Sequence, residues 1–224
     1  MASVAIDGPA GAGKSTIAKL VAKKLGAVYV DTGAMYRAIA VYFLRNHLAP
    51  ENPEQVAQAC QKLEVAISYE NGAQQVWLNG ENVTGELRAE AVGNMASKSS
   101  AKQPVRDKLL QLQRDMAVRQ NVVMDGRDIG TNVLPDAEVK IFLTASSAER
   151  ARRRYEELVE KGEACDIHQI EADIIKRDEQ DMNRAIAPLK QAEDAYYLDS
   201  SELTINEVVD CILKQCKEKR IWKS

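Results

Sequence analysis

The stretch AIDGPAGAGKST, residues 5–16, contains the pattern that decides the fold. A short apolar run leads into glycines, and Lys14 and Ser15 follow, so the stretch matches G-x-x-x-x-G-K-[ST]. The next residues, 14–25, carry apolar side chains at helical spacing. Strand, glycine-rich loop and helix in this order are the context in which the pattern forms a phosphate-binding loop.

This loop predicts a site for a nucleoside triphosphate. Backbone N–H groups of residues 10–15 are expected to point at the phosphates, at the start of the helix. Lys14 is a compact charge for the oxygens of the transferred group, and the Ser15 hydroxyl is a ligand for Mg²⁺. The N-K-x-D sequence with which GTPases read guanine is absent, which favours ATP. The predicted ATP-binding residues are Gly8, Pro9, Ala10, Gly11, Ala12, Gly13, Lys14, Ser15 and Thr16.

Composition limits the other classes of function. The 224 residues fit one domain, and 45% of them are hydrophobic, enough for a real core. With 30 basic and 33 acidic residues, the chain is not expected to bind nucleic acid or membrane surfaces broadly. No apolar signal-peptide segment or long apolar run is present, and none of the four cysteines belongs to a C-x-x-C pair. We therefore expect a cytoplasmic protein with free thiols.

Apolar runs and helical patterns alternate along most of the chain. The runs expected to form strands are 4–6, 27–30, 122–124, 139–143 and 196–198, and the helical patterns are about 14–25, 34–46, 102–118, 146–161, 166–185 and 205–218. This alternation predicts an α/β fold, a five-stranded parallel sheet with helices on both faces. Asp7, Asp31 and Asp125 end three of the runs and Asp199 follows the last. Because such sheets bind ligands at the carboxyl ends of their strands, these aspartates are expected beside the phosphate loop.

Residues 64–84 break this rhythm. Alternating apolar and polar residues surround Asn71-Gly72, and a second Asn-Gly pair follows at Asn79-Gly80. Asn-Gly between alternating runs predicts a hairpin. We expect a small antiparallel insert that rides on the main domain as a flap, with helices before it at 53–63 and after it at 86–99.

Arginines and aspartates gather in the later stretches. DTGAMYR ends in Arg37, and DGRDIGT places Arg127 between Asp125, which resembles a Walker-B position near the metal and Lys14, and Asp128. AERARRR contains Arg150, Arg153 and Arg154, and in KRDEQDMNRAIAPL the spacing puts Arg177, Asp181 and Arg184 on one helix face. Each alone is typical of a solvated ion pair. Together with a phosphate loop they suggest two polyanionic substrates in one site.

Four stretches in order, IDGPAGAGKST, DTGAMYRA, DGRDIGT and RD..D.NRA.APL, resemble bacterial cytidylate kinase, in the nucleoside monophosphate kinase family. The resemblance runs from residue 3 to about 210 and includes the insert. It implies ATP-dependent phosphorylation of CMP and dCMP to CDP and dCDP by direct in-line transfer, with Mg²⁺ as cofactor, in a monomer. It also implies a single P-loop kinase domain, 1–224, divided into a core (about 1–31, 102–145 and 185–224), a monophosphate-binding region (32–101) and a lid (150–166).

The resemblance also implies residue roles. Arg37 and Arg127 are expected to bind the CMP phosphate, and Arg177 and Asp181 the ribose. Ser97, Arg106 and Asp128 are expected to read cytosine with help from Arg184, and Thr32, Tyr36 and Gly126 complete the CMP site. Arg150, Arg153 and Arg154 fall in the lid, and with Lys14 and Arg127 they form the expected catalytic set. Asp128 suits cytosine because a carboxylate accepts a hydrogen bond from its N4 amino group but faces a carbonyl in uracil.

Two other readings stay open at this level. One is a kinase of another nucleotide or of a small metabolite such as shikimate, with the same loop and short lid but without selectivity for cytosine. The other is a nucleotide-binding or regulatory protein that binds ATP without turnover. A panel of acceptors separates the three, because only a (d)CMP kinase turns over CMP and dCMP in preference to UMP and AMP.

Overall fold

The computed structural model describes residues 1–220, so the last four residues of the expected core lie outside the described part of the chain. Its main sheet has five parallel strands in the order β2-β6-β1-β7-β8. The strands are β1 (Ser3–Asp7), β2 (Val28–Asp31), β6 (Val122–Gly126), β7 (Val139–Thr144) and β8 (Tyr196–Asp199). All five predicted strands and the parallel fold are confirmed.

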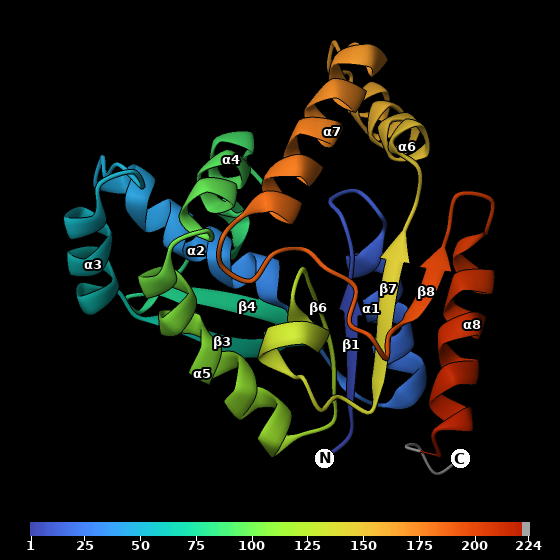
Figure 1. Cartoon of the computed structure of the whole chain (residues 1–224). Helices are drawn as coiled ribbons and strands as arrows, with labels where there is room; N and C mark the ends of the chain where they lie inside the picture. The colour runs from blue at the N-terminus through green and yellow to red at the C-terminus, as the bar shows by residue number, and fades with distance from the viewer. Residues whose placement is uncertain (221–224) are drawn as a thin grey trace.

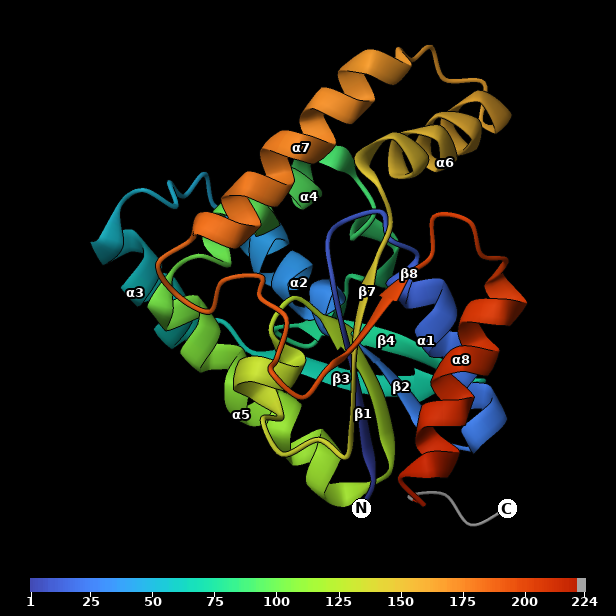
Figure 2. The ribbon, with the colours of Figure 1, turned by 45° about the vertical axis from the view of Figure 1, so that its right-hand side comes forward.

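Helices cover both faces of this sheet (Figures 1 and 2). One face packs against α1 (Lys14–Leu25) and α8 (Ile205–Glu218), and the other against α2 (Thr32–Arg45) and α5 (Gln103–Arg119). In β1, Val4 and Ile6 belong to the core cluster with α1 and α8, whereas Ala5 belongs to the cluster with α2. Burial on both faces is why these strands read as continuous apolar runs.

The remaining helices are α3 (Pro53–Lys62), α4 (Glu90–Ser99), α6 (Ser147–Glu160) and α7 (Ile167–Asn183). Two predicted starts were wrong. Helix α2 begins two residues early because the Asp31 side chain accepts a hydrogen bond from the Ala34 N–H and caps the helix. Helix α4 begins four residues late because Thr84–Glu86 forms a separate 3₁₀ turn.

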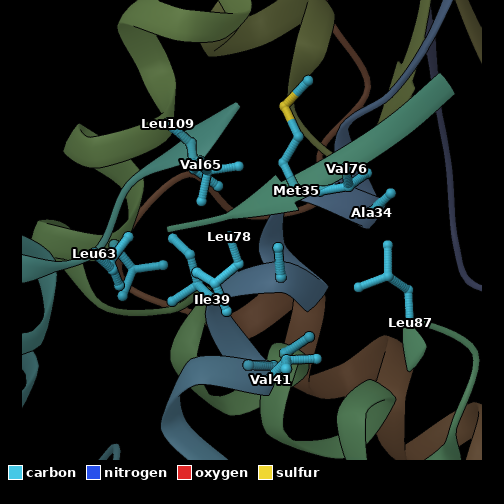
Figure 3. Packing of buried hydrophobic residues seen from close by; sticks show 14 of the residues in the cluster. Ala34, Met35, Ile39, Val41, Leu63, Val65, Val76, Leu78, Leu87 and Leu109 are labelled. Carbon is cyan, nitrogen blue, oxygen red and sulfur yellow. The ribbon is translucent and has the colours of Figure 1, made fainter. Parts of the chain in front are cut away.

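The predicted insert is a three-stranded antiparallel sheet of β3 (Val65–Glu70), β4 (Ala73–Leu78) and a short β5 (Glu81–Asn82). Asn71 and Asn79 both have a φ of 50°, as expected for the Asn-Gly turns that join the strands. The insert has no core of its own, because Val76 and Leu78 pack in one cluster with residues of α2 such as Met35 and Ile39 (Figure 3). It is therefore fixed to the helix that follows β2.

Helices α6 and α7 form an arm beyond the carboxyl ends of β7 and β8 (Figure 1). Helix α7 ends at Asn183, so the prediction that Arg177, Asp181 and Arg184 share one helix face holds only for the first two. The returning chain ends the helix, because the Leu189 N–H donates to the Asp181 carbonyl. No helix within residues 1–220 is long and apolar enough to cross a membrane.

Candidate active site

A cleft of about 410 Å³ opens at the carboxyl edge of the main sheet. Its walls come from the phosphate loop, the start of α2, the end of β6 and helices α4, α5 and α7. The predicted site residues that line it are Ala10, Gly11, Gly13, Lys14, Ser15, Thr16, Thr32, Tyr36, Arg37, Ser97, Arg106, Gly126, Arg127, Asp128, Arg177, Asp181 and Arg184. The fold thus brings most of the predicted donor and acceptor residues into one cavity.

Two glycines shape the phosphate loop. At Gly8 an added Cβ would lie 1.9 Å from the Leu143 carbonyl oxygen of β7, so only glycine fits. Gly13 precedes α1 with a left-handed φ of 82°, which glycine adopts without strain. Gly8, Pro9 and Ala12 do not line the cleft, and they build the turn that presents the other loop residues.

Lys14 is buried and lines the cleft. Its Nζ donates a hydrogen bond to the Pro9 carbonyl at 2.6 Å. Burial and then the positive charge of Arg127 lower the pKa of Lys14 to about 7. A bound anion would raise the pKa of Lys14 again, because its negative charge favours the protonated ammonium.

Ser15 and Asp125 place oxygen ligands beside the loop. Ser15 Oγ donates to Asp125 Oδ2 at 3.0 Å, and the Tyr29 hydroxyl donates to Asp125 Oδ1 at 2.9 Å. Burial and the charge of Asp31 raise the pKa of Asp125 to about 6. A hydroxyl and a carboxylate are the hard oxygen ligands that Mg²⁺ takes, and a cation would relieve the buried charge. The pair fits the expected metal, with Asp125 at the Walker-B position that the sequence indicated.

Asp128 lines the cleft among the residues that are expected to bind the acceptor. It accepts hydrogen bonds from Arg106 and, at 3.3 Å, from Arg184, and Asn132 donates to it at 3.2 Å. Arg106 also lies over the ring of Tyr36, 5.5 Å from its centroid. The carboxylate is buried, and these cationic partners compensate for its charge. Asp128 is therefore held in place before any ligand arrives.

Three arginines face the space between the two sides. Arg127 Nε donates to Asp181 Oδ2 at 2.8 Å. Burial by itself would raise the pKa of Asp181, but the charges of Arg127, Arg184 and Arg177 and this hydrogen bond together lower it. Within residues 1–220, Arg37 and Arg177 form no hydrogen bond or ion pair through their guanidinium groups, and burial is the main cause of the lowered pKa of each. Seven basic and five acidic side chains line the cleft, so it is suited to anions.

The three arginines predicted for the lid do not line this cleft. Arg150 is buried, with its guanidinium on both oxygens of Asp178 at 2.6 and 3.1 Å and on the Ala10 carbonyl at 3.0 Å. Arg153 donates to the Ser200 carbonyl, and Arg154 pairs with Glu157 on the surface. In this structure Arg150 braces the phosphate loop, and the other two lie outside the cavity.

Sequence reasoning did not single out several residues that line the cleft as site residues: Asp31, Gly33, Arg88, Ala96, Ser100 and Glu157. Asp31 was expected at this edge, because it ends a strand. No pattern in the sequence indicated Arg88 as a site residue, because it belongs to no motif or arginine cluster and lies between the insert and α4. The predicted Thr32 does line the cleft, but its hydroxyl already donates to the Asp125 carbonyl at 2.7 Å.

Comparisons with known proteins show the family to which the chain belongs. The family model for cytidylate kinase matches residues 4–218. Cytidylate kinases from Geobacter sp. (strain M21) and Caldicellulosiruptor saccharolyticus are 48% and 50% identical to the chain, over 96% and 95% of it and 93% and 94% of their own lengths. The solved structure of an uncharacterized protein from Eubacterium ventriosum covers 97% of this chain and 99% of its own, at 12% identity and a TM-score of 0.55, which supports the fold alone. The chain belongs to the cytidylate kinase family and is a phosphotransferase.

Proposed function

We propose that the cleft carries out the reaction of this family by direct in-line transfer, in which the γ-phosphoryl group of ATP passes to CMP or dCMP and yields CDP or dCDP. The observation that carries the proposal is that Asp128, held by Arg106 and Arg184, lies in the same cleft as Lys14 and the phosphate loop. A donor site and a carboxylate suited to an amino-bearing base thus share one cavity. No covalent enzyme intermediate is needed.

The donor half holds the triphosphate of ATP. Backbone N–H groups of residues 10–15 bind its phosphates, and Lys14 balances the charge that shifts as the γ-phosphoryl group leaves. Mg²⁺, with Ser15 and Asp125 as its nearest protein oxygens, would neutralise charge on the phosphates when bound. Ser15 Oγ and Asp125 Oδ2 are 3.0 Å apart, close enough to bind one cation directly or through water.

The acceptor half holds the monophosphate and turns one of its oxygens toward ATP. Arg37 and Arg127 neutralise the acceptor phosphate, which otherwise repels the triphosphate. Arg177 and Asp181 bind the ribose. This transfer depends on positioning and charge neutralisation, which the arginines supply without any proton shuttle.

Base selectivity comes from Asp128 with Arg106, Arg184 and Ser97. The carboxylate accepts a hydrogen bond from the N4 amino group of cytosine, whereas uracil presents a carbonyl to the same oxygens. An unpaired buried acceptor of this kind lowers kcat/KM about tenfold to a hundredfold.

The arm of α6 and α7 is proposed to close over ATP and exclude water, which would otherwise compete as acceptor. Arg154 is exposed and pairs with the exposed Glu157, whereas Arg153 is partly exposed and pairs with the half-buried Glu149. We propose that phosphates of ATP replace these glutamates as partners. Arg150 acts from its place against the phosphate loop, through Ala10.

The test is ADP release with CMP, dCMP, UMP and AMP in turn. We expect turnover with CMP and dCMP and a rate about tenfold to a hundredfold lower with UMP. Equal rates with all four, or turnover with AMP alone, would indicate a different kinase. ATP binding without turnover of any acceptor would indicate a regulatory protein.

A monomer and a cytoplasmic location are part of the same proposal, because both are implied by the family. Light scattering coupled to gel filtration tests the first, with 24.8 kDa expected for one chain. Cell fractionation tests the second. A stable dimer would require the cleft to be reconsidered with residues from a second copy.

A further inference from the structure

Arg88 lies where the β insert rejoins the main domain, between the 3₁₀ turn Thr84–Glu86 and α4. The residue before it, Leu87, is buried in the same cluster as Ala34 and Val76 (Figure 3). The Arg88 side chain, by contrast, is 67% exposed and lines the cleft. Its backbone is therefore anchored, while its guanidinium can move within the cavity.

The partner of Arg88 in this structure holds it weakly. Its Nη2 lies 3.6 Å from Asp31 Oδ2, too far for a direct hydrogen bond. Asp31 is already engaged, because its other oxygen accepts from the Ala34 N–H at 2.9 Å. No hydrogen bond joins Arg88 to another residue among those that the structure describes, so its donors remain available to a stronger acceptor.

Three other arginines of the cleft are already paired with aspartates. Arg106 and Arg184 serve Asp128, and Arg127 is paired with Asp181. Arg88 lies on the other side, near Arg37, and its positive charge contributes to the lowered pKa of Arg37 after burial. Two arginines that repel each other at one end of a cavity are stabilised together by a dianion between them.

We propose that Arg88 binds the phosphate of the acceptor nucleotide together with Arg37, so that the β insert supplies a substrate ligand. The inference rests on the proposed function, since it takes the acceptor to be a nucleoside monophosphate. A guanidinium binds a phosphate through two parallel N–H groups, a stronger contact than the long ion pair with Asp31.

The test is steady-state kinetics of Arg88→Met in the full chain. With CMP varied at saturating ATP, KM for CMP is expected to rise about tenfold or more, the scale of a lost charge-assisted hydrogen bond. With ATP varied at saturating CMP, KM for ATP stays within about twofold, because the phosphate loop is unchanged. Arg88→Lys should recover part of the loss, since lysine keeps the charge but not the paired N–H groups.

Arg45→Met is the matched control. Arg45 is a second arginine that contacts the insert region, through Glu81 and Glu86, but it does not line the cleft. The KM of Arg45→Met for CMP should equal that of the wild type. A wild-type KM for CMP in Arg88→Met overturns the inference, and so does an equal rise in Arg45→Met, which would indicate a loosened insert. A wild-type protein that does not turn over CMP is a separate result, and it overturns the proposed function itself.

Discussion

The donor and acceptor halves of the cleft are built in different ways. The proposed donor half is one contiguous stretch, residues 8–16, and the groups proposed to bind phosphate are mainly its backbone N–H groups at the start of α1. The acceptor half is made of side chains from separate elements: Arg37 of α2, Arg106 of α5, Asp128 after β6 and Arg184 after α7. Backbone N–H groups recognise any triphosphate, whereas a set of side chains can select one base.

This difference separates the effects of mutation. Damage to the donor half should lower the rate with every acceptor by a similar factor. Damage to the acceptor half should change the ratio between acceptors or the KM of the acceptor alone. Four substitutions, from the largest expected effect to the smallest, test this division.

Lys14→Met should give the largest effect. Lys14 carries the only charge in residues 8–16, and we propose that it neutralises the γ-phosphate. Its loss is expected to lower kcat about a thousandfold for CMP and dCMP alike. The variant should fold, because methionine fills a similar space and the buried ammonium has a pKa lowered by burial. Single-turnover rates measure the loss of phosphoryl transfer, and thermal unfolding checks that the variant folds. A loss confined to one acceptor would break the proposed separation of the halves.

Asp128→Asn should act on selectivity. The ratio of kcat/KM for CMP to that for UMP is expected to fall about tenfold to a hundredfold, since the amide no longer offers two acceptors to the N4 amino group. KM for ATP should not change. Asp194→Asn is the control, because Asp194 is an exposed carboxylate with Lys140 as its cationic partner. An unaltered ratio in Asp128→Asn would remove this residue from base recognition.

The same contrast explains what the sequence could predict. The strand, the phosphate loop and the helix of the donor half are consecutive in the sequence, so a single motif predicted all three. The two arginine partners of Asp128 are 22 and 56 residues away in the sequence, and only the fold brings them together. Arg106 was predicted only from the family resemblance, and Arg184 was predicted from helical spacing as well. Nothing in spacing or composition could pair either arginine with Asp128.

The structure differs from the predictions at residues whose position is set by contacts with distant parts of the chain. Arg184 lies beyond α7 because the chain folds back and the Leu189 N–H takes the Asp181 carbonyl, a contact that helical periodicity does not encode. Arg150 has the spacing of a surface residue in an arginine-rich helix, yet Asp178 and Ala10 bury it against the loop. Arg88 was missed because a lone arginine is normally a solvated side chain.

The pH dependence of stability tests the donor half without substrate. The folded pKa of Asp125 is raised to about 6 by burial and Asp31, so its contribution to the free energy of unfolding is full below pH 3.8 and is lost as pH rises through 6. Between pH 5 and pH 7 this amounts to about 1 kcal/mol. Urea unfolding of the wild type should show that loss, and Asp125→Asn should show less of it. The buried Asp7, whose pKa is also raised to about 6, contributes in both proteins. If the free energy of unfolding depends on pH in the same way in the wild type and in Asp125→Asn, the pKa of Asp125 is not raised in the folded protein.

The smallest effect is expected at Gln74 of β4, which docks the insert on the edge strand β2. Its Oε1 accepts from the Asp31 N–H at 2.9 Å, and its Nε2 donates to the Asp31 carbonyl at 3.1 Å, as a neighbouring strand would. Gln74→Leu leaves both backbone groups without these partners and loosens the start of α2, which carries Arg37.

We therefore expect KM for CMP to rise about threefold to fivefold in Gln74→Leu, with KM for ATP unchanged, because the lost hydrogen bonds are only partly buried. Gln75→Leu is the control, since Gln75 is the next residue along β4 and bonds instead to Asn82 within the insert. A rise in KM for ATP would mean that the insert also supports the donor half, since Asp31 and Asp125 are paired across β2 and β6. An effect on CMP alone would place the boundary between the two halves at the end of β2, where Asp31 joins the insert to the acceptor arginines.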